Sequence, residues 1–166
     1  MIEIDVPPQP TLTTERLILR PLRDSDAAAV ADGAGDKRVA RYLIQVPTPY
    51  PITLARGWVR HRSEWWGLGR GLTLALATHE EPDTLVGTAS LRRHARDRRA
   101  ELGYWLAEPA WGHGYATEAT RAIVDYGFRA MNLARVYALV LAGNTASERV
   151  LDKLGMQREG VQRQHV

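Results

Sequence analysis

The sequence contains no cysteine. Disulfides, thiolate metal sites and a cysteine nucleophile are therefore excluded. The histidines show no metal-ligand spacing, so the sequence predicts no metal site. Long apolar runs are missing as well, and the first ten residues lack the basic and apolar regions of a signal peptide. We therefore expect a cytoplasmic protein with no membrane partner.

Internal repeats, linkers and low-complexity tracts are also absent from these 166 residues. A hydrophobic content of 45% and a charged content of 25% are ordinary for a globular protein. The sequence therefore predicts a single domain over residues 1–166.

Positive charge is only slightly in excess, with a formal net charge of +3 at pH 7. The basic residues cluster between two predicted strands, as Arg92, Arg93, His94, Arg96, Arg98 and Arg99. No aromatic residues interleave with them, so a solvated hairpin tip is favoured over a nucleic-acid patch. Nucleic acid is not expected as a partner, and a nucleic-acid-binding domain stays a third reading.

The predicted elements follow a mixed order. Short helices come early, an antiparallel meander of strands follows, and a strand–helix–strand–helix unit ends the chain. Strands are predicted around 17–22, 72–76, 85–91, 99–107 and 136–141, and helices around 24–31, 37–43, 53–66, 116–130 and 145–154. This order implies an α/β or α+β layered domain.

The segment Trp111–Ala116 is the most informative part of the chain, because it joins an aromatic strand to an amphipathic helix. Gly112 and Gly114 let the backbone approach a ligand and direct N–H groups at it. A helix start adds a partial positive charge, which suits a phosphate or pyrophosphate.

Other phosphate-binding motifs fit this segment badly. A Walker A loop needs Lys followed by Ser or Thr, but Tyr115 and Ala116 follow Gly114. Thr117 occupies the third small position of a dinucleotide-binding fingerprint. From the two glycines alone, a helix start without any ligand is as good an interpretation.

Four stretches of sequence, in a fixed order, favour a ligand-binding turn over a helix start without a ligand. They are Thr14–Leu17 with Leu19–Pro21, Glu101–Leu106, Trp111–Ala119, and Asn144–Ser147 through Lys153–Met156. Together they resemble the GNAT superfamily of acyl-CoA-dependent N-acyltransferases, nearest to the RimJ/RimL-type ribosomal-protein alanine acetyltransferases. The resemblance covers nearly the whole chain.

The resemblance implies the GNAT fold: a mixed, mostly antiparallel sheet with helices on both faces and two parallel strands that splay apart around acetyl-CoA. Here those strands are expected to be Glu101–Ala107 and Val136–Leu141. Relatives continue through another strand, so the final strand of the sheet is expected to be missing from residues 1–166. An uncovered edge invites pairing, and a homodimer is one way to cover it.

The resemblance also implies cofactor contacts. The backbone of Trp105, Leu106 and Ala107 is expected to pair with the pantetheine arm, and Asn144 to reach the pantetheine or phosphate region, although it is also a plain helix N-cap. The pyrophosphate is expected on the main chain of Trp111, Gly112, His113, Gly114, Tyr115, Ala116 and Thr117. Pro109 departs from the family, which often has Arg or Gln at this position.

Transfer of an acetyl group to an amine poses two proton problems: the amine must lose a proton, and the departing thiolate gains from receiving one. By resemblance Glu101 is the candidate base, directly or through a water, and Ser147 is the candidate proton donor and a cofactor contact. An ion pair between Glu101 and a neighbouring arginine, and a bond from Ser147 to the helix backbone, are equally good interpretations. Tyr104 and Tyr115 are alternative hydroxyls.

The sequence is therefore interpreted as an acetyl-CoA-dependent N-acetyltransferase. Without cysteine, direct transfer in a ternary complex is the simplest route, to a protein N-terminus or a small-molecule amine. The acceptor is expected near the aromatic residues of the early helices, namely Tyr42, Tyr50, Trp58, Trp65 and Trp66. The alternative is a non-catalytic acyl-CoA-binding module.

Overall fold

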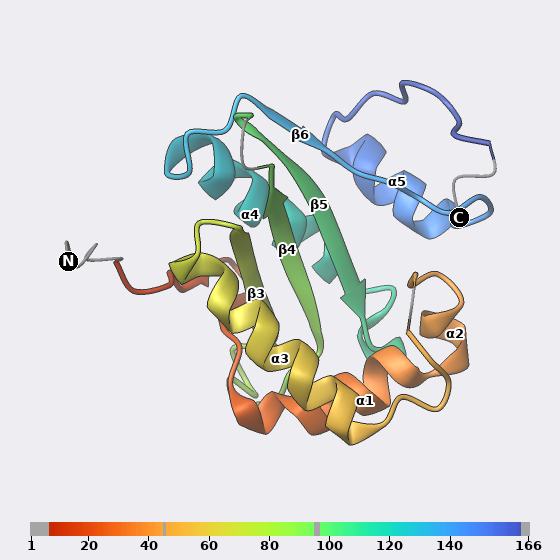
Figure 1. The fold of residues 1–166 in the computed structure, drawn as a ribbon. Coiled ribbons are helices and arrows are strands. Elements are labelled where there is room, and N and C mark those ends of the chain that lie inside the picture. Colours follow the sequence, from red (N-terminus) through yellow and green to blue (C-terminus); the bar gives the residue numbers. More distant parts are fainter. Residues whose placement is uncertain (1–6, 45, 95–96, 164–166) are drawn as a thin grey trace.

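A six-stranded sheet with its strands in chain order forms the centre of the protein (Figure 1). The structure is a computed structural model that describes residues 7–44, 46–94 and 97–163. Its elements are β1 (Leu12–Thr13), β2 (Leu17–Pro21), η1 (Asp24–Asp26), α1 (Ala27–Gly35), α2 (Lys37–Ala40), α3 (Ile52–Gly67), β3 (Gly71–Thr78), β4 (Gly87–Arg93), β5 (Arg99–Leu106), η2 (Glu108–Ala110), α4 (Tyr115–Arg129), β6 (Arg135–Tyr137) and α5 (Thr145–Lys153).

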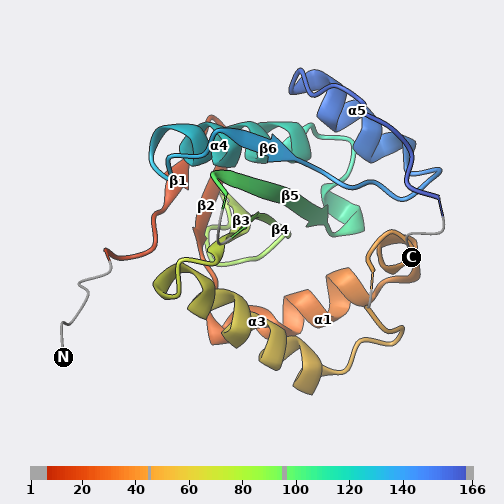
Figure 2. The same cartoon turned by 45° about the horizontal axis from the view of Figure 1, so that its top comes forward.

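Helices cover both faces of this sheet. Figure 2 shows α4 on one face and α1 with α3 on the other. The alternation of side chains along each strand supplies a core to each face: Leu74 and Leu91 pack with Ile123 of α4, whereas Ala75 and Trp105 pack with Val59 of α3. The predicted mixed fold, with helices on both faces, is confirmed.

The sheet is antiparallel from β1 to β5 and parallel only between β5 and β6. That parallel ladder runs from the pair Arg99–Arg135 to the pair Glu101–Tyr137 and then ends. Beyond Glu101, β5 continues to Leu106 without pairing to β6. The predicted splayed parallel pair is therefore present, with Glu101 at the point where the strands part.

One predicted strand is too long. The β-branched and apolar run Val136–Leu141 predicts a six-residue strand, but β6 is Arg135–Tyr137 and residues 138–141 have no regular secondary structure. The cause is the splay itself, because a strand requires a hydrogen-bonded neighbour and β5 has already turned away.

Helix α5 begins and ends as its sequence predicts. The Asn144 side chain accepts a hydrogen bond from Ser147 N–H at 3.2 Å, and Gly155 follows the helix with φ of 77°. The N–H groups of Gly155 and Met156 donate to the carbonyls of Asp152 and Leu151, which is the Schellman arrangement. Within the described ranges, no residue after α5 lies in a strand.

Candidate acetyl-donor and acceptor site

The glycine turn before α4 presents a row of backbone donors. Gly112 and Gly114 both have φ of 79°, a left-handed conformation that favours glycine. Across the part of the chain that the structure describes, the N–H groups of Gly112, His113, Gly114, Tyr115, Ala116 and Thr117 have no hydrogen-bond acceptor. These donors and the positive end of α4 together make a site for an anion.

Trp111 does not share this property. Its backbone N–H donates to Glu108 O at 3.0 Å, and its indole Nε1 donates to Leu106 O at 2.9 Å. The row of available donors therefore begins at Gly112, and Trp111 joins the turn to the end of β5 through its side chain.

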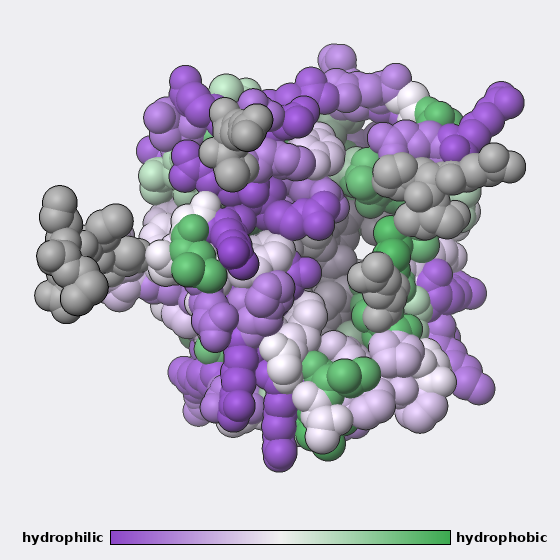
Figure 3. Space-filling model, in the orientation of Figure 1, coloured by the Kyte–Doolittle hydropathy of each residue, from purple (hydrophilic) through white to green (hydrophobic). Residues whose placement is uncertain are grey.

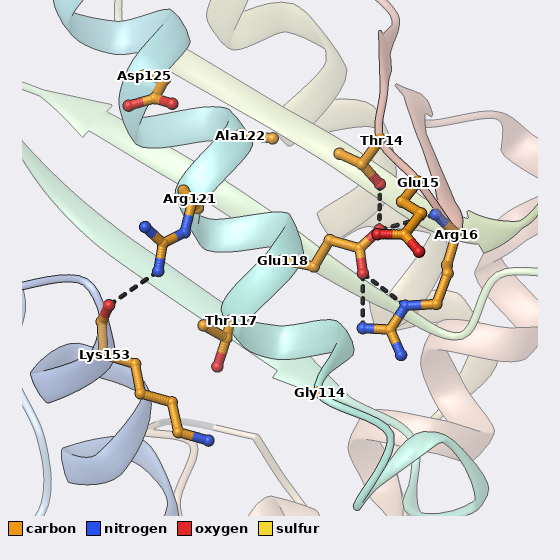
Figure 4. Close-up of a pocket in the computed structure, with 10 residues that line it drawn as sticks. All are labelled: Thr14, Glu15, Arg16, Gly114, Thr117, Glu118, Arg121, Ala122, Asp125 and Lys153. Carbon is orange, nitrogen blue, oxygen red and sulfur yellow. Dashed lines mark hydrogen bonds and ion pairs between the residues drawn. The ribbon is translucent and has the colours of Figure 1, made fainter.

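Residues from the N-terminal segment hold this turn in shape (Figure 4). The Arg16 guanidinium donates to His113 O at 2.7 Å and to Glu118 Oε2 at 2.8 Å. Glu118 Oε1 also accepts from Thr14 Oγ1 at 2.6 Å and from Arg16 N–H at 2.8 Å. Tyr115 stacks on His113, and Arg16 lies over the Tyr115 ring.

We call Thr14, Arg16 and Glu118 the turn clamp. Sequence reasoning missed its function. The stretch Thr14–Leu17 was one signal of the resemblance, but its partner Glu118 is 102 residues from Arg16. The pKa of Glu118 is lowered: burial raises it, but the Thr14 hydroxyl and the Arg16 N–H and guanidinium together outweigh that effect.

An open groove of about 560 Å³ lies beside the turn clamp. Its lining includes Gly114 and Thr117 at the start of α4, Arg121 one turn later, and Lys153 at the end of α5. Arg121 donates to Lys153 O at 2.9 Å, which ties the two helices together (Figure 4). Cations thus stand beside the free amides, although sequence periodicity marked Arg121 only as a solvent-facing residue.

The edge of β5 that faces the splay offers further backbone groups. In an antiparallel ladder alternate residues direct N–H and C=O to the same neighbour. Ala107 N–H donates to Val86 O, and Ala107 O accepts from Ala110 N–H. Ala107 is thus left without an available backbone group, and by alternation Trp105 faces β4, whereas Tyr104 and Leu106 face the splay.

Glu101 lies at the apex of the splay with 21% of its side chain exposed. Its Oε2 pairs with Arg92 and accepts from the Tyr137 hydroxyl at 3.4 Å, and that hydroxyl lies 2.6 Å from His94 Nε2. Its Oε1 has no hydrogen-bond partner within residues 7–44, 46–94 and 97–163. The alternative of an ion pair with a neighbouring arginine is therefore observed, and one oxygen of the Glu101 carboxylate is still available.

Ser147 lies across the splay from β5. Its backbone O accepts from the Tyr104 hydroxyl at 3.3 Å, and its N–H is capped by Asn144. No described residue bonds to the Ser147 Oγ. Burial raises the pKa of Tyr104, and its hydrogen bond to Ser147 partly opposes this. Asn144 is therefore an N-cap, and the Ser147 hydroxyl is available.

The aromatic residues expected around the acceptor divide into two groups. Trp65 is a buried residue of α3, and Trp66 donates to Pro7 O at 2.6 Å, so both are structural. Tyr42 instead bridges the mouth of the splay, since its hydroxyl donates to Gly143 O at 3.4 Å. Figure 3 shows apolar surface on the right-hand side of the molecule. Ile44, two residues after Tyr42, and Leu139, two residues after β6, are both exposed.

The arginine cluster forms contacts within its own hairpin and the neighbouring turn. Arg92 pairs with Glu101, Arg99 with Asp97, and Arg98 donates to both Asn132 O and Oδ1. Arg96 lies outside the described residues. Over the described ranges, no helix has the length and apolarity to cross a bilayer, and no group of three His, Asp or Glu side chains is arranged for a metal ion.

Comparison with known proteins agrees with this geometry. Residues 16–157 match the acetyltransferase (GNAT) domain. The chain is 35% identical to the uncharacterized N-acetyltransferase YoaA of Bacillus subtilis, over 95% of this chain and 88% of the relative. It is 26% identical to the [ribosomal protein uS5]-alanine N-acetyltransferase of Escherichia coli, over 92% and 81%. Mycobacterium smegmatis RimJ, solved in complex with CoA-disulfide, superposes with a TM-score of 0.79 at 27% identity, over 90% and 74%.

Proposed function

The chain belongs to the GNAT acetyltransferase family, and we propose that it moves the acetyl group of acetyl-CoA directly to a primary amine within a ternary complex. The family establishes an N-acetyltransferase that uses acetyl-CoA. The absence of cysteine supports direct transfer, because an acyl-cysteine cannot form.

The free amides of Gly112 to Thr117 hold the pyrophosphate of the donor. Six N–H groups and a helix start favour negative charge there, and Arg121 and Lys153 stand beside them. The pantetheine arm lies along the splay-facing edge of β5, where Tyr104 and Leu106 direct their backbone groups. Trp111 and Ala107 act by shaping this path, since the Trp111 N–H and both backbone groups of Ala107 are already bonded.

Acetyl-CoA supplies an acetyl group already activated as a thioester. Glu101 Oε1 accepts the proton that the amine loses, directly or through a water. Arg92 and Tyr137 hold the same carboxylate through Oε2, so its orientation is fixed while Oε1 stays available. His94 holds the Tyr137 hydroxyl in turn.

The Ser147 hydroxyl donates a proton to the departing sulfur. It lies one turn into α5, opposite Tyr104, and the Asn144 cap fixes the start of that helix. The Tyr104 hydroxyl, half-buried against Ser147, is the second donor at this position.

For the acceptor we propose a protein N-terminus first and a small-molecule amine second. The relative that acts on ribosomal protein uS5 supports a protein acceptor. The exposed apolar residues at the mouth of the splay, Ile44 and Leu139, support one as well. A cytoplasmic location and a homodimer stay predictions, to be checked by cell fractionation and by sedimentation.

The single observation that carries this proposal is the row of unbonded amides at a turn next to a splayed strand pair. It is tested by calorimetry with acetyl-CoA and by thiol release over a panel of amines and N-terminal peptides. We expect binding, turnover, and intersecting lines in double-reciprocal plots of initial rate. Parallel lines would indicate a covalent acyl-enzyme and contradict direct transfer.

A further inference from the structure

Arg62 is an arginine of α3 whose guanidinium has no anionic partner among the described residues. Its guanidinium carbon lies 3.8 Å from the centroid of the Trp65 ring and 5.5 Å from that of Trp58. The stack orients the planar group, as cation–π contacts do. The side chain is half-buried, and its Nε is enclosed without a hydrogen bond.

Arg20 is a fully buried arginine of the same protein, and its hydrogen bonds are satisfied. Arg20, with 4% of its surface exposed, donates two hydrogen bonds of 2.8 Å to Asp26 and others to the carbonyls of Pro82 and Asp83. An enclosed cation without an acceptor is costly. Arg62 therefore has the characteristics of a group that is completed by a ligand.

Arg62 also lies within electrostatic reach of Arg92 and Glu101 at the apex of the splay. Odd-numbered residues of β5 and even-numbered residues of β4 point to the α1–α3 face, which places Glu101 and Arg92 beneath α3. The pKa of Arg62 is lowered, first by burial and then by Arg92, whereas Glu101 and Tyr50 act in the opposite direction. Glu101 thus acts electrostatically on both guanidinium groups, but only Arg92 pairs with it.

We propose that Arg62 binds a carboxylate of the acceptor, so that the preferred substrate is a primary amine with a carboxylate close to it. This inference rests on the proposed function and narrows its substrate class. A carboxylate fits best because its single charge matches the one guanidinium left over once Arg92 pairs with Glu101. It also accepts two parallel hydrogen bonds from the planar fork of arginine.

Two sources supply such a carboxylate: the α-carboxylate of a free amino acid, or an acidic side chain close to a peptide N-terminus. Alanine and alaninamide test the first source. The peptides Ala-Asp-Gly-amide and Ala-Asn-Gly-amide test the second. In each pair the two compounds differ only by a carboxylate and an amide.

The experiment compares kcat/KM for both pairs in the wild-type protein, Arg62→Gln and Arg62→Lys. We expect wild type to prefer one carboxylate about ten- to a hundredfold over its amide, as for a charge-assisted hydrogen bond. Arg62→Gln abolishes the preference and Arg62→Lys retains part of it. The pair that shows the effect identifies the source. Equal preferences in wild type and Arg62→Gln, or no preference in either pair, would overturn the proposal.

Arg56→Gln is the matched control, because Arg56 is an exposed arginine on the same helix. It should leave the preference unchanged. The affinity for CoA and the thermal midpoint of each variant separate a lost contact from a lost fold, and both should stay near the wild-type values in Arg62→Lys.

A binding measurement separates this inference from the proposed function. N-acetylalanine and N-acetylalaninamide have no free amine and are titrated in the presence of CoA. Tighter binding of N-acetylalanine by wild type than by Arg62→Gln supports the carboxylate site even when no amine is turned over. Equal binding of both compounds to both proteins counts against it.

Discussion

The α4 side and the α1–α3 side of the sheet contribute to the site in different ways. On the α4 side the backbone offers the unbonded groups, namely the amides of Gly112 to Thr117 and the open edge of β5. On the α1–α3 side Arg92 pairs with Glu101 at the apex of the splay, and Arg62 of α3 lies within electrostatic reach of both. A backbone site suits a constant ligand such as CoA, whereas side chains can vary with the acceptor.

The largest expected effect on activity comes from removing the candidate base on the α1–α3 side. We expect Glu101→Gln to lower kcat by about 10²–10⁴-fold, most strongly below the pKa of the amine, about 7.7–8.0 for an N-terminus. The affinity for CoA should be unchanged, because the α4 side is untouched. Stopped-flow or steady-state rates over pH check this, with the exposed Glu64→Gln as control. An unchanged pH–rate profile would remove Glu101 as the base.

A substitution in the glycine turn tests the α4 side of the sheet alone. In Gly114→Val a β-branched residue has to adopt φ of 79°, and its Cβ lies 3.4 Å from Arg16 Nη2 of the turn clamp. We expect CoA to bind about a hundredfold more weakly, partly because such strain costs about 1–3 kcal/mol. Calorimetry measures this against Gly160→Val, where an added Cβ meets no neighbouring atom. Retained affinity would refute the placement of the pyrophosphate.

A smaller effect on kcat is expected from Ser147, the candidate proton donor. Ser147→Ala should lower kcat by about tenfold, because a thiolate of pKa near about 8.5 leaves with modest help from a proton donor. KM for acetyl-CoA should change little. The exposed Ser25→Ala is the control. If Ser147→Ala is fully active and Tyr104→Phe is not, the Tyr104 hydroxyl takes this role.

The smallest expected effect concerns the turn clamp. Since the pKa of Glu118 is lowered in the folded protein, its contribution to stability is present above the unfolded pKa and is lost as the pH falls through the folded one. We expect Glu118→Gln to lower the thermal midpoint by about 2–4 °C at pH 7. The difference from wild type should shrink below about pH 4.3. A difference that stays constant with pH, or one matched by the exposed Glu81→Gln, would contradict this.

Local signals predicted the backbone side well. Glycines at 112 and 114, the periodic apolar residues of α4 and the cap at Asn144 each act over a few residues, so the sequence displays them directly. The limits of β6 were missed because they depend on where its neighbour turns away. The assignment of Ala107 to pantetheine pairing missed the strand alternation that directs its N–H to Val86.

Side-chain pairings between distant parts of the chain could not be predicted from the sequence, for a different reason. Arg62 is one of many arginines, and only the structure shows that it lacks a carboxylate while Arg20 has one. Arg16 and Glu118 gave no sign of partnership, since no local pattern links residues so far apart in the chain.

That long separation has a consequence for how the protein becomes active. The loop that we propose receives the nucleotide is held by residues about a hundred positions earlier in the chain, so the N-terminal segment must meet α4 before the loop acquires its form. A fragment that begins after residue 20 would keep every glycine of the motif and still bind poorly. Formation of the proposed donor site thus depends on this long-range contact, and we expect CoA binding to report that the N-terminal segment has docked on α4.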